Sequence, residues 1–159
     1  MNPSPGIIAN ADSDEIMVVN GAVSGLALIL RLLTGPGDRV VVDHPTYPLA
    51  IAAIQGASCR PVGVSLPEHG WDTAGLVATI AQTAPRMAYL MPDFHNPTGR
   101  CMDAATRQVV ADIAERTRTT LVIDETMVNL WYDAPPPPPR PPRRIPAPTS
   151  TSSWKEMTR

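Results

Sequence analysis

The sequence is poor in aromatic residues, cysteine and lysine. It holds one Phe, three Trp and three Tyr in 159 residues, so its core must come from Val, Ile, Leu, Ala and Met. Its two cysteines, Cys59 and Cys101, lie far apart without CxxC spacing. This predicts a reducing compartment and argues against a disulfide framework. No apolar run approaches the ~20 residues of a membrane helix, and no signal-peptide pattern occurs, so we expect a cytoplasmic protein without membrane contact.

Several common catalytic patterns are also missing. Neither GxGxxG nor the GxxxxGK[ST] phosphate loop occurs, and GAVSG differs from the GxSxG of a nucleophile elbow. The histidines His44, His69 and His95 have no ligand-like spacing to Cys, Asp or Glu, so no metal site is expected. The net charge of −2 gives no reason to expect nucleic-acid binding through this segment.

The sequence does contain an alternation of short apolar runs with helical patterns. Strands are expected over residues 15–19, 39–43, 59–65, 86–91 and 119–124. Helices are expected over 22–33, 49–55, 74–83 and from 104 to about 116, with Asp72 or Thr73 and Asp103 as caps. Such alternation predicts an α/β fold, a three-layer α/β/α arrangement around a mostly parallel sheet.

Composition divides the chain into three parts. Residues 1–14 are polar and turn-rich, an irregular lead-in, and 15–133 form the expected domain. Nine of the 19 prolines fall in residues 134–148, within a basic tail that spans 134–159. Such a stretch has too little apolar surface to offset the entropy of ordering, so we expect disordered or polyproline-like chain. A motif for a proline-binding domain is the less favoured interpretation.

Four loops are expected at one rim, because ligands of parallel sheets bind outside the carboxyl ends of the strands. These loops are NGAVSG (20–25), HPTYP (44–48), DFHNPTG (93–99) and IDET (123–126). The first suits phosphate, through free N–H groups at a helix start, or is a plain turn. Tyr47, held between two prolines, either stacks on a planar ligand or caps the core. Asp124 ends an apolar strand, where a carboxylate is costly unless it is paired with a cation or a strong donor.

The four loops in this order resemble the large domain of fold-type I, pyridoxal-phosphate-dependent aminotransferases of class I/II. PDFHNPTG and DETMVNLW are most similar to the aminotransferase-like domain of MocR-type regulators of the GntR superfamily. The resemblance covers about residues 10–133, and HNPTG followed by IDE is its specific part. It implies a partial large domain of that fold, pyridoxal 5'-phosphate as cofactor, an amino acid or 2-oxo acid as small-molecule partner, and a homodimer.

The same resemblance implies a role for individual residues. Ala22 and Val23 would offer backbone N–H groups to the cofactor phosphate, and Tyr47 would stack on the pyridine ring. Asn96 would donate a hydrogen bond to the phenolic oxygen of the ring. Asp124 would pair with the protonated ring nitrogen and so keep the ring an electron sink.

The sequence departs from the family in two places. Many members carry a Tyr three residues after the aspartate of the ring nitrogen, where this chain has Met127. The Schiff-base lysine of the family follows a strand and a Ser-rich loop, whereas Lys155, the only lysine here, has no strand pattern before it. The substrate-binding small domain and the DNA-binding helices of a full regulator have no counterpart, so we expect a fragment.

Three interpretations stay open from the sequence. The chain is an aminotransferase with Lys155 as nucleophile, a regulatory module that senses cofactor or amino acid, or a non-functional piece of the fold. We predict that it binds pyridoxal phosphate weakly and non-covalently and does not catalyse transamination at a useful rate.

Overall fold

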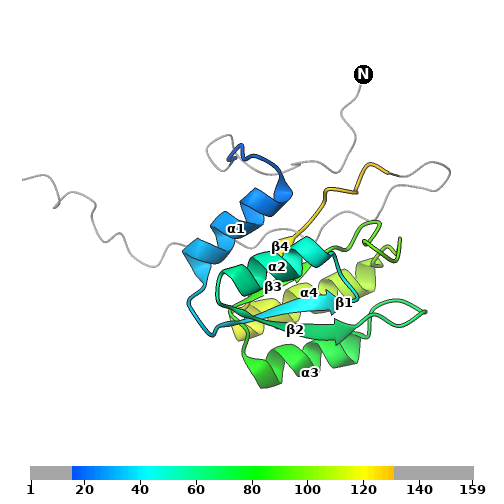
Figure 1. The fold of residues 1–159 in the computed structure, drawn as a ribbon. Coiled ribbons are helices and arrows are strands. Elements are labelled where there is room, and N and C mark those ends of the chain that lie inside the picture. Colours follow the sequence, from blue (N-terminus) through cyan, green and yellow to red (C-terminus); the bar gives the residue numbers. More distant parts are fainter. Residues whose placement is uncertain (1–15, 131–159) are drawn as a thin grey trace, which may run out of the picture.

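The computed structural model of the chain describes residues 16–130, in which helices and strands alternate (Figure 1). In chain order the elements are α1 (Ala22–Leu33), β1 (Arg39–His44), α2 (Pro48–Gly56), β2 (Arg60–Ser65), α3 (Thr73–Thr83), β3 (Met87–Leu90), α4 (Ala104–Thr117) and β4 (Thr120–Ile123). The predicted bounds of all of these elements are confirmed to within one residue. The expected lead-in over 1–14 and the tail over 134–159 lie outside the described residues.

The four strands form one sheet in the order β2-β1-β3-β4, and every pair in it is parallel. This confirms the predicted parallel sheet. The chain moves outward from β1 to β2, returns past β1 to β3, and continues to β4. The direction of winding therefore reverses between β1 and β3, and in such sheets the crevice at this point is the usual ligand site.

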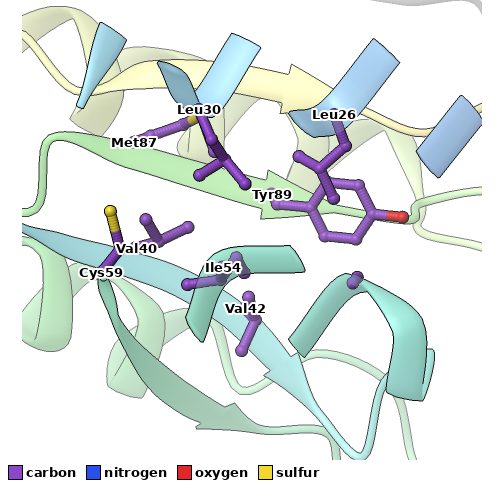
Figure 2. Packing of buried hydrophobic residues seen from close by; sticks show 9 residues of the cluster. Leu26, Leu30, Val40, Val42, Ile54, Cys59, Met87 and Tyr89 are labelled. Carbon is purple, nitrogen blue, oxygen red and sulfur yellow. The ribbon is translucent and has the colours of Figure 1, made fainter. Parts of the chain in front are cut away.

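Helices cover both faces of the sheet and produce the three layers. In Figure 1, α1 and α2 lie on one face, and α3 and α4 lie on the other. Val40 and Val42 of β1 pack under α1 and α2, whereas Val41 packs under α3 and α4. Because each face is buried, the strand is continuously apolar instead of alternating. Figure 2 shows the first of these cores, with Leu26 and Leu30 of α1 above the strands.

The predicted strand at 15–19 is wrong for the part that the structure describes. Residues 16–19 form no strand, and Met17 and Val18 are 73% and 94% exposed. A β-branched run predicts a strand, but pairing with a neighbouring strand decides whether one forms. No described strand pairs with this run. The NGAVSG loop is thus the start of α1 without a strand before it.

Side-chain caps fix the starts of α3 and α4 as expected. Asp72 Oδ1 accepts a hydrogen bond from the Gly75 amide at 2.8 Å. Asp103 Oδ1 accepts one from the Thr106 amide at 2.7 Å. Among residues 16–130, none of the helices is sufficiently long and apolar to cross a membrane.

Candidate functional site

A buried carboxyl group on β1 bonds to Trp71 and to the residue that follows β3. Asp43, near the end of β1, is 1% exposed and accepts hydrogen bonds from Trp71 Nε1 at 2.8 Å and the Met91 amide at 3.3 Å. Burial raises the pKa of Asp43 from 3.8 to about 6, although both hydrogen bonds act in the opposite direction. Asp43 thereby fixes the start of the loop after β3 to β1 and to Trp71.

His95 lies against this carboxyl group. Its side chain is fully buried, and its Nε2 lies 3.6 Å from Asp43 Oδ2, beyond an ordinary hydrogen bond. Its Nδ1 lies 2.9 Å from the Thr98 hydroxyl, and its ring meets Trp71 edge-on. Burial, and then the nearby Arg100, lower the pKa of His95, so the ring is neutral at neutral pH. The neutral tautomer with the proton on Nε2 lets Nδ1 accept from Thr98 and directs the Nε2–H toward Asp43.

The loop that carries Asn96 is closed by its own backbone. The His95 amide donates to the Arg100 carbonyl at 2.8 Å, and the Gly99 amide donates to the His95 carbonyl at 2.6 Å. Gly99 has a φ of 69°, which favours glycine. The Asn96 amide donates to Met91 Sδ at 3.1 Å, which fixes the backbone of Asn96 at the end of β3.

A buried ion pair holds the base of the same loop. Arg107 of α4 contacts Asp93 at 2.7 Å, and both side chains are nearly inaccessible. Arg107 Nε also donates to the Met102 carbonyl at 2.9 Å. Because a buried charge is tolerated when it is paired and hydrogen-bonded, the two ends of the loop are fixed to α4.

The start of α1 offers unused amide donors. Gly21 is the N-cap, with a φ of 92°, and supplies no side-chain acceptor. The first amides of a helix have no acceptor within it, and they carry the positive end of the helix dipole. Ala22 and Val23 therefore present N–H groups that suit an anion, and no acidic side chain lies in this first turn.

A cavity of about 210 Å³ connects the start of α1 with the end of β4. It is lined by Ala22, Gly25, Leu26, Ile29, Tyr89, Val122, Ile123, Asp124, Glu125 and Thr126. Of the five predicted cofactor residues, Ala22 and Asp124 lie in this lining, whereas Val23, Tyr47 and Asn96 do not. The start of α1, apolar side chains and the carboxylates of Asp124 and Glu125 thus line one cavity, a set of groups that suits a flat ligand with a phosphate and a cationic ring.

Asp124 is held by three donors of the chain. The Tyr89 hydroxyl donates to Oδ2. The Thr126 amide and hydroxyl donate to Oδ1 at 2.9 Å and 2.6 Å. Burial, and then the hydrogen bond to Asp124, raise the pKa of Tyr89 well above its usual range, so that the phenol stays protonated. These hydrogen bonds offset the unfavourable free energy of placing a carboxylate at the end of an apolar strand.

Tyr47 is the N-cap of α2 and packs, half-buried, on the core that contains Leu26 and Tyr89. It lies near enough to Tyr89 to affect its pKa. Both of the sequence alternatives for Tyr47 are compatible with this position. Lys155 lies outside the described residues. Among residues 16–130, no three His, Cys, Asp or Glu side chains are grouped as metal ligands.

Sequence reasoning did not select Tyr89, Asp43 or the side chain of His95. Only the register of the folded sheet distinguishes Tyr89, which pairs with Val122. Asp124 follows Val122 by two residues, which places its side chain on the face of Tyr89. For Asp43, an acid inside a β-branched run was the available signal.

The family model described as aminotransferase class I and II matches residues 5–144 of this chain. YdfD, an uncharacterized HTH-type transcriptional regulator of Bacillus subtilis strain 168, is 30% identical over 128 residues, which is 80% of this chain and 27% of the regulator. LysN, an alpha-aminoadipate aminotransferase from Thermus thermophilus complexed with N-(5'-phosphopyridoxyl)-L-leucine, matches with a TM-score of 0.61 and 28% identity, over 65% of this chain and 27% of LysN.

A multiple substrate aminotransferase from Thermococcus profundus gives a TM-score of 0.60 and 29% identity, over 69% of this chain and 28% of that enzyme. The chain spans about a quarter of the length of the curated relatives that it matches.

Proposed function

The chain belongs to the class I and II aminotransferase family, and from this membership we propose that residues 15–133 are a partial large domain that binds pyridoxal 5'-phosphate. The observation that carries the proposal is the cavity that links the amides of α1 with the carboxylate of Asp124. A phosphate and a protonated ring nitrogen need these two groups at opposite ends of one site. The ligand of LysN, a phosphopyridoxyl group joined to an amino acid, has this chemistry.

Each proposed contact has a physical reason. Ala22 and Val23 bind the phosphate through the N–H groups at the start of α1. Asp124 orients the ring by accepting from its protonated nitrogen. Tyr47 stacks on one face of the ring, and Asn96 donates from the adjacent loop to the phenolic oxygen. When bound, the cofactor supplies an electron sink for amino-group transfer between an amino acid and a 2-oxo acid.

Lys155 is the one residue that could hold this cofactor covalently, because the chain has no other lysine. We propose that binding is non-covalent and that turnover is negligible. Borohydride treatment of the loaded protein, followed by mass spectrometry, should therefore find no phosphopyridoxyl adduct on Lys155. A stoichiometric adduct, together with transamination that is lost in Lys155→Ala, would restore the enzyme interpretation.

A cofactor titration followed by absorbance tests the proposed site. We expect saturable binding by the full chain and a loss of about tenfold in affinity for Asp124→Ala, the size of one hydrogen bond to a charged group. Asp112→Ala is the matched control, because Asp112 is exposed on α4 and pairs with Gln108. Equal binding by all three proteins, or none by the wild type, would refute the site.

A second candidate function is effector sensing within a transcriptional regulator, favoured by the similarity to YdfD over most of this chain. Any DNA contact would then come from another part of such a protein, consistent with the acidic balance of the chain. A sensing domain should change the absorbance of bound cofactor on addition of amino acid without releasing a 2-oxo acid.

The free cysteines Cys59 and Cys101 support the proposed cytoplasmic location.

A further inference from the structure

The Tyr89 hydroxyl donates a hydrogen bond to Asp124, a carboxylate that lines the cavity beside α1 and accepts hydrogen bonds on both of its oxygens. We propose that Tyr89 is a positioning residue, which orients the Asp124 carboxylate toward the ring nitrogen of the bound ligand. This inference rests on the proposed function, since it concerns how the same site recognises its ligand.

The register of the sheet brings the two side chains together. Tyr89 on β3 pairs with Val122 on β4, and Asp124 lies two residues further along the same face. The Tyr89 ring is 4% exposed and packs in the core with Leu26. In Figure 2 its hydroxyl points away from the other core side chains. A ring clamped in this way holds its hydroxyl in a fixed position.

The direction of the hydrogen bond is set by burial. The pKa of Tyr89 is raised above its usual range, first by desolvation and then by the bond to Asp124. The phenol therefore stays protonated, and its hydroxyl donates the hydrogen bond to Asp124. This donation restrains the orientation of the Asp124 carboxylate.

The Asp124 carboxylate keeps a free acceptor site for a ligand. An ionised carboxylate offers about four lone-pair sites. The Tyr89 hydroxyl occupies one site on Oδ2, and the amide and hydroxyl of Thr126 occupy two on Oδ1. About one acceptor site remains, and Asp124 lines the cavity. A protonated aromatic nitrogen has one N–H, which matches this remaining site.

A purely structural Tyr89 would affect every ligand of the cavity equally, and a comparison of two ligands separates the alternatives. The probes are pyridoxal 5'-phosphate and its deaza analogue, in which CH replaces the ring nitrogen. The full chain and Tyr89→Phe are titrated with both. We expect Tyr89→Phe to bind pyridoxal 5'-phosphate about fivefold more weakly, which corresponds to a fraction of one charge-assisted hydrogen bond. We expect its affinity for the deaza analogue to be unchanged.

Thr117→Val is the control for loss of a partly buried hydroxyl, because Thr117 bonds to Ile113 at the opposite end of β4. It should leave both affinities unchanged. Should Tyr89→Phe fail to fold, Thr126→Val removes one of the three donors and should weaken binding of the nitrogen-containing ligand alone, by about twofold.

Two results would overturn the inference while leaving the proposed function intact. One is an equal loss of both affinities in Tyr89→Phe, and the other is no loss in either. A wild-type chain that binds neither ligand would instead overturn the proposed function together with this inference.

Discussion

At the scale of single residues, two carboxyl groups at strand ends have different environments. Asp124 reaches the cavity and is held by three donors. Asp43 is 1% exposed and faces the neutral ring of His95. The first is suited to meet a ligand, whereas the second joins β1 to Trp71 and to the residue that follows β3. Both were acids in apolar runs of the sequence, and only their neighbours distinguish them.

The buried Asp43 predicts a pH dependence of stability. Burial raises the pKa of this carboxyl from 3.8 to about 6. Between these values the folded chain binds more protons than the unfolded chain, so the free energy of unfolding falls as the pH rises. The loss attributable to Asp43 is about 3 kcal/mol. On going from acidic to neutral pH, the free energy of unfolding of Asp43→Asn should therefore rise by about 3 kcal/mol relative to that of the wild type.

Urea denaturation of both proteins, at about pH 4 and about pH 7.5, measures this difference. Asp72→Asn is the control, because Asp72 is an exposed cap whose replacement keeps the acceptor. The free energy of unfolding of Asp72→Asn should change between the two pH values as that of the wild type does. A constant difference between Asp43→Asn and the wild type over the whole range would contradict the assignment.

The sequence predicted the site residues in the loops but not the side chains that hold those residues in place. Asn96 and Asp124 stand in a recognisable order along the chain, so similarity could select them. Tyr89 sits in the apolar run MAYL and is indistinguishable from a core residue by pattern. Its function depends on the register between β3 and β4, which is a property of the folded sheet.

At the scale of elements, α4 carries the base of the Asn96 loop and depends on its cap. Asp103 accepts from the Thr106 amide, and this bond is the main reason that the pKa of Asp103 is lowered. Asp103→Ala should lower the free energy of unfolding by about 1 kcal/mol, whereas Asp103→Asn should retain most of it. Urea denaturation followed by circular dichroism measures both, and an Asp103→Ala protein as stable as the wild type would exclude a capping role.

The elements were predictable because their patterns are local. Helical spacing in α1, capping residues before α3 and α4, and Gly and Pro between elements mark their ends. The run at 15–19 failed because nothing local distinguishes a strand from exposed apolar chain. Strand order was likewise inaccessible, since the pairing of β1 with β3 joins segments far apart in sequence.

At the scale of the whole molecule, α1 exposes an apolar surface. Leu28 and Leu32, one helical turn apart, are 44% and 78% exposed. Burial of two adjacent exposed leucines would stabilise a contact between copies, and we propose that copies of the chain associate here as a homodimer. The double variant Leu28→Lys, Leu32→Lys should shift sedimentation toward the monomer, whereas Leu49→Lys on α2, with 51% exposure of Leu49, should not. A wild-type monomer at every concentration would refute this.

Binding of pyridoxal 5'-phosphate in the cavity between α1 and Asp124 can be followed residue by residue. The isotopically labelled full chain is titrated with the cofactor, and the amide NMR resonances are recorded. We expect saturable shifts of Ala22 and Val23, the proposed phosphate donors, and of Thr126, whose amide donates to Asp124, with Thr117 unmoved. Saturable shifts confined to residues away from this rim, such as those around Lys155, would contradict it.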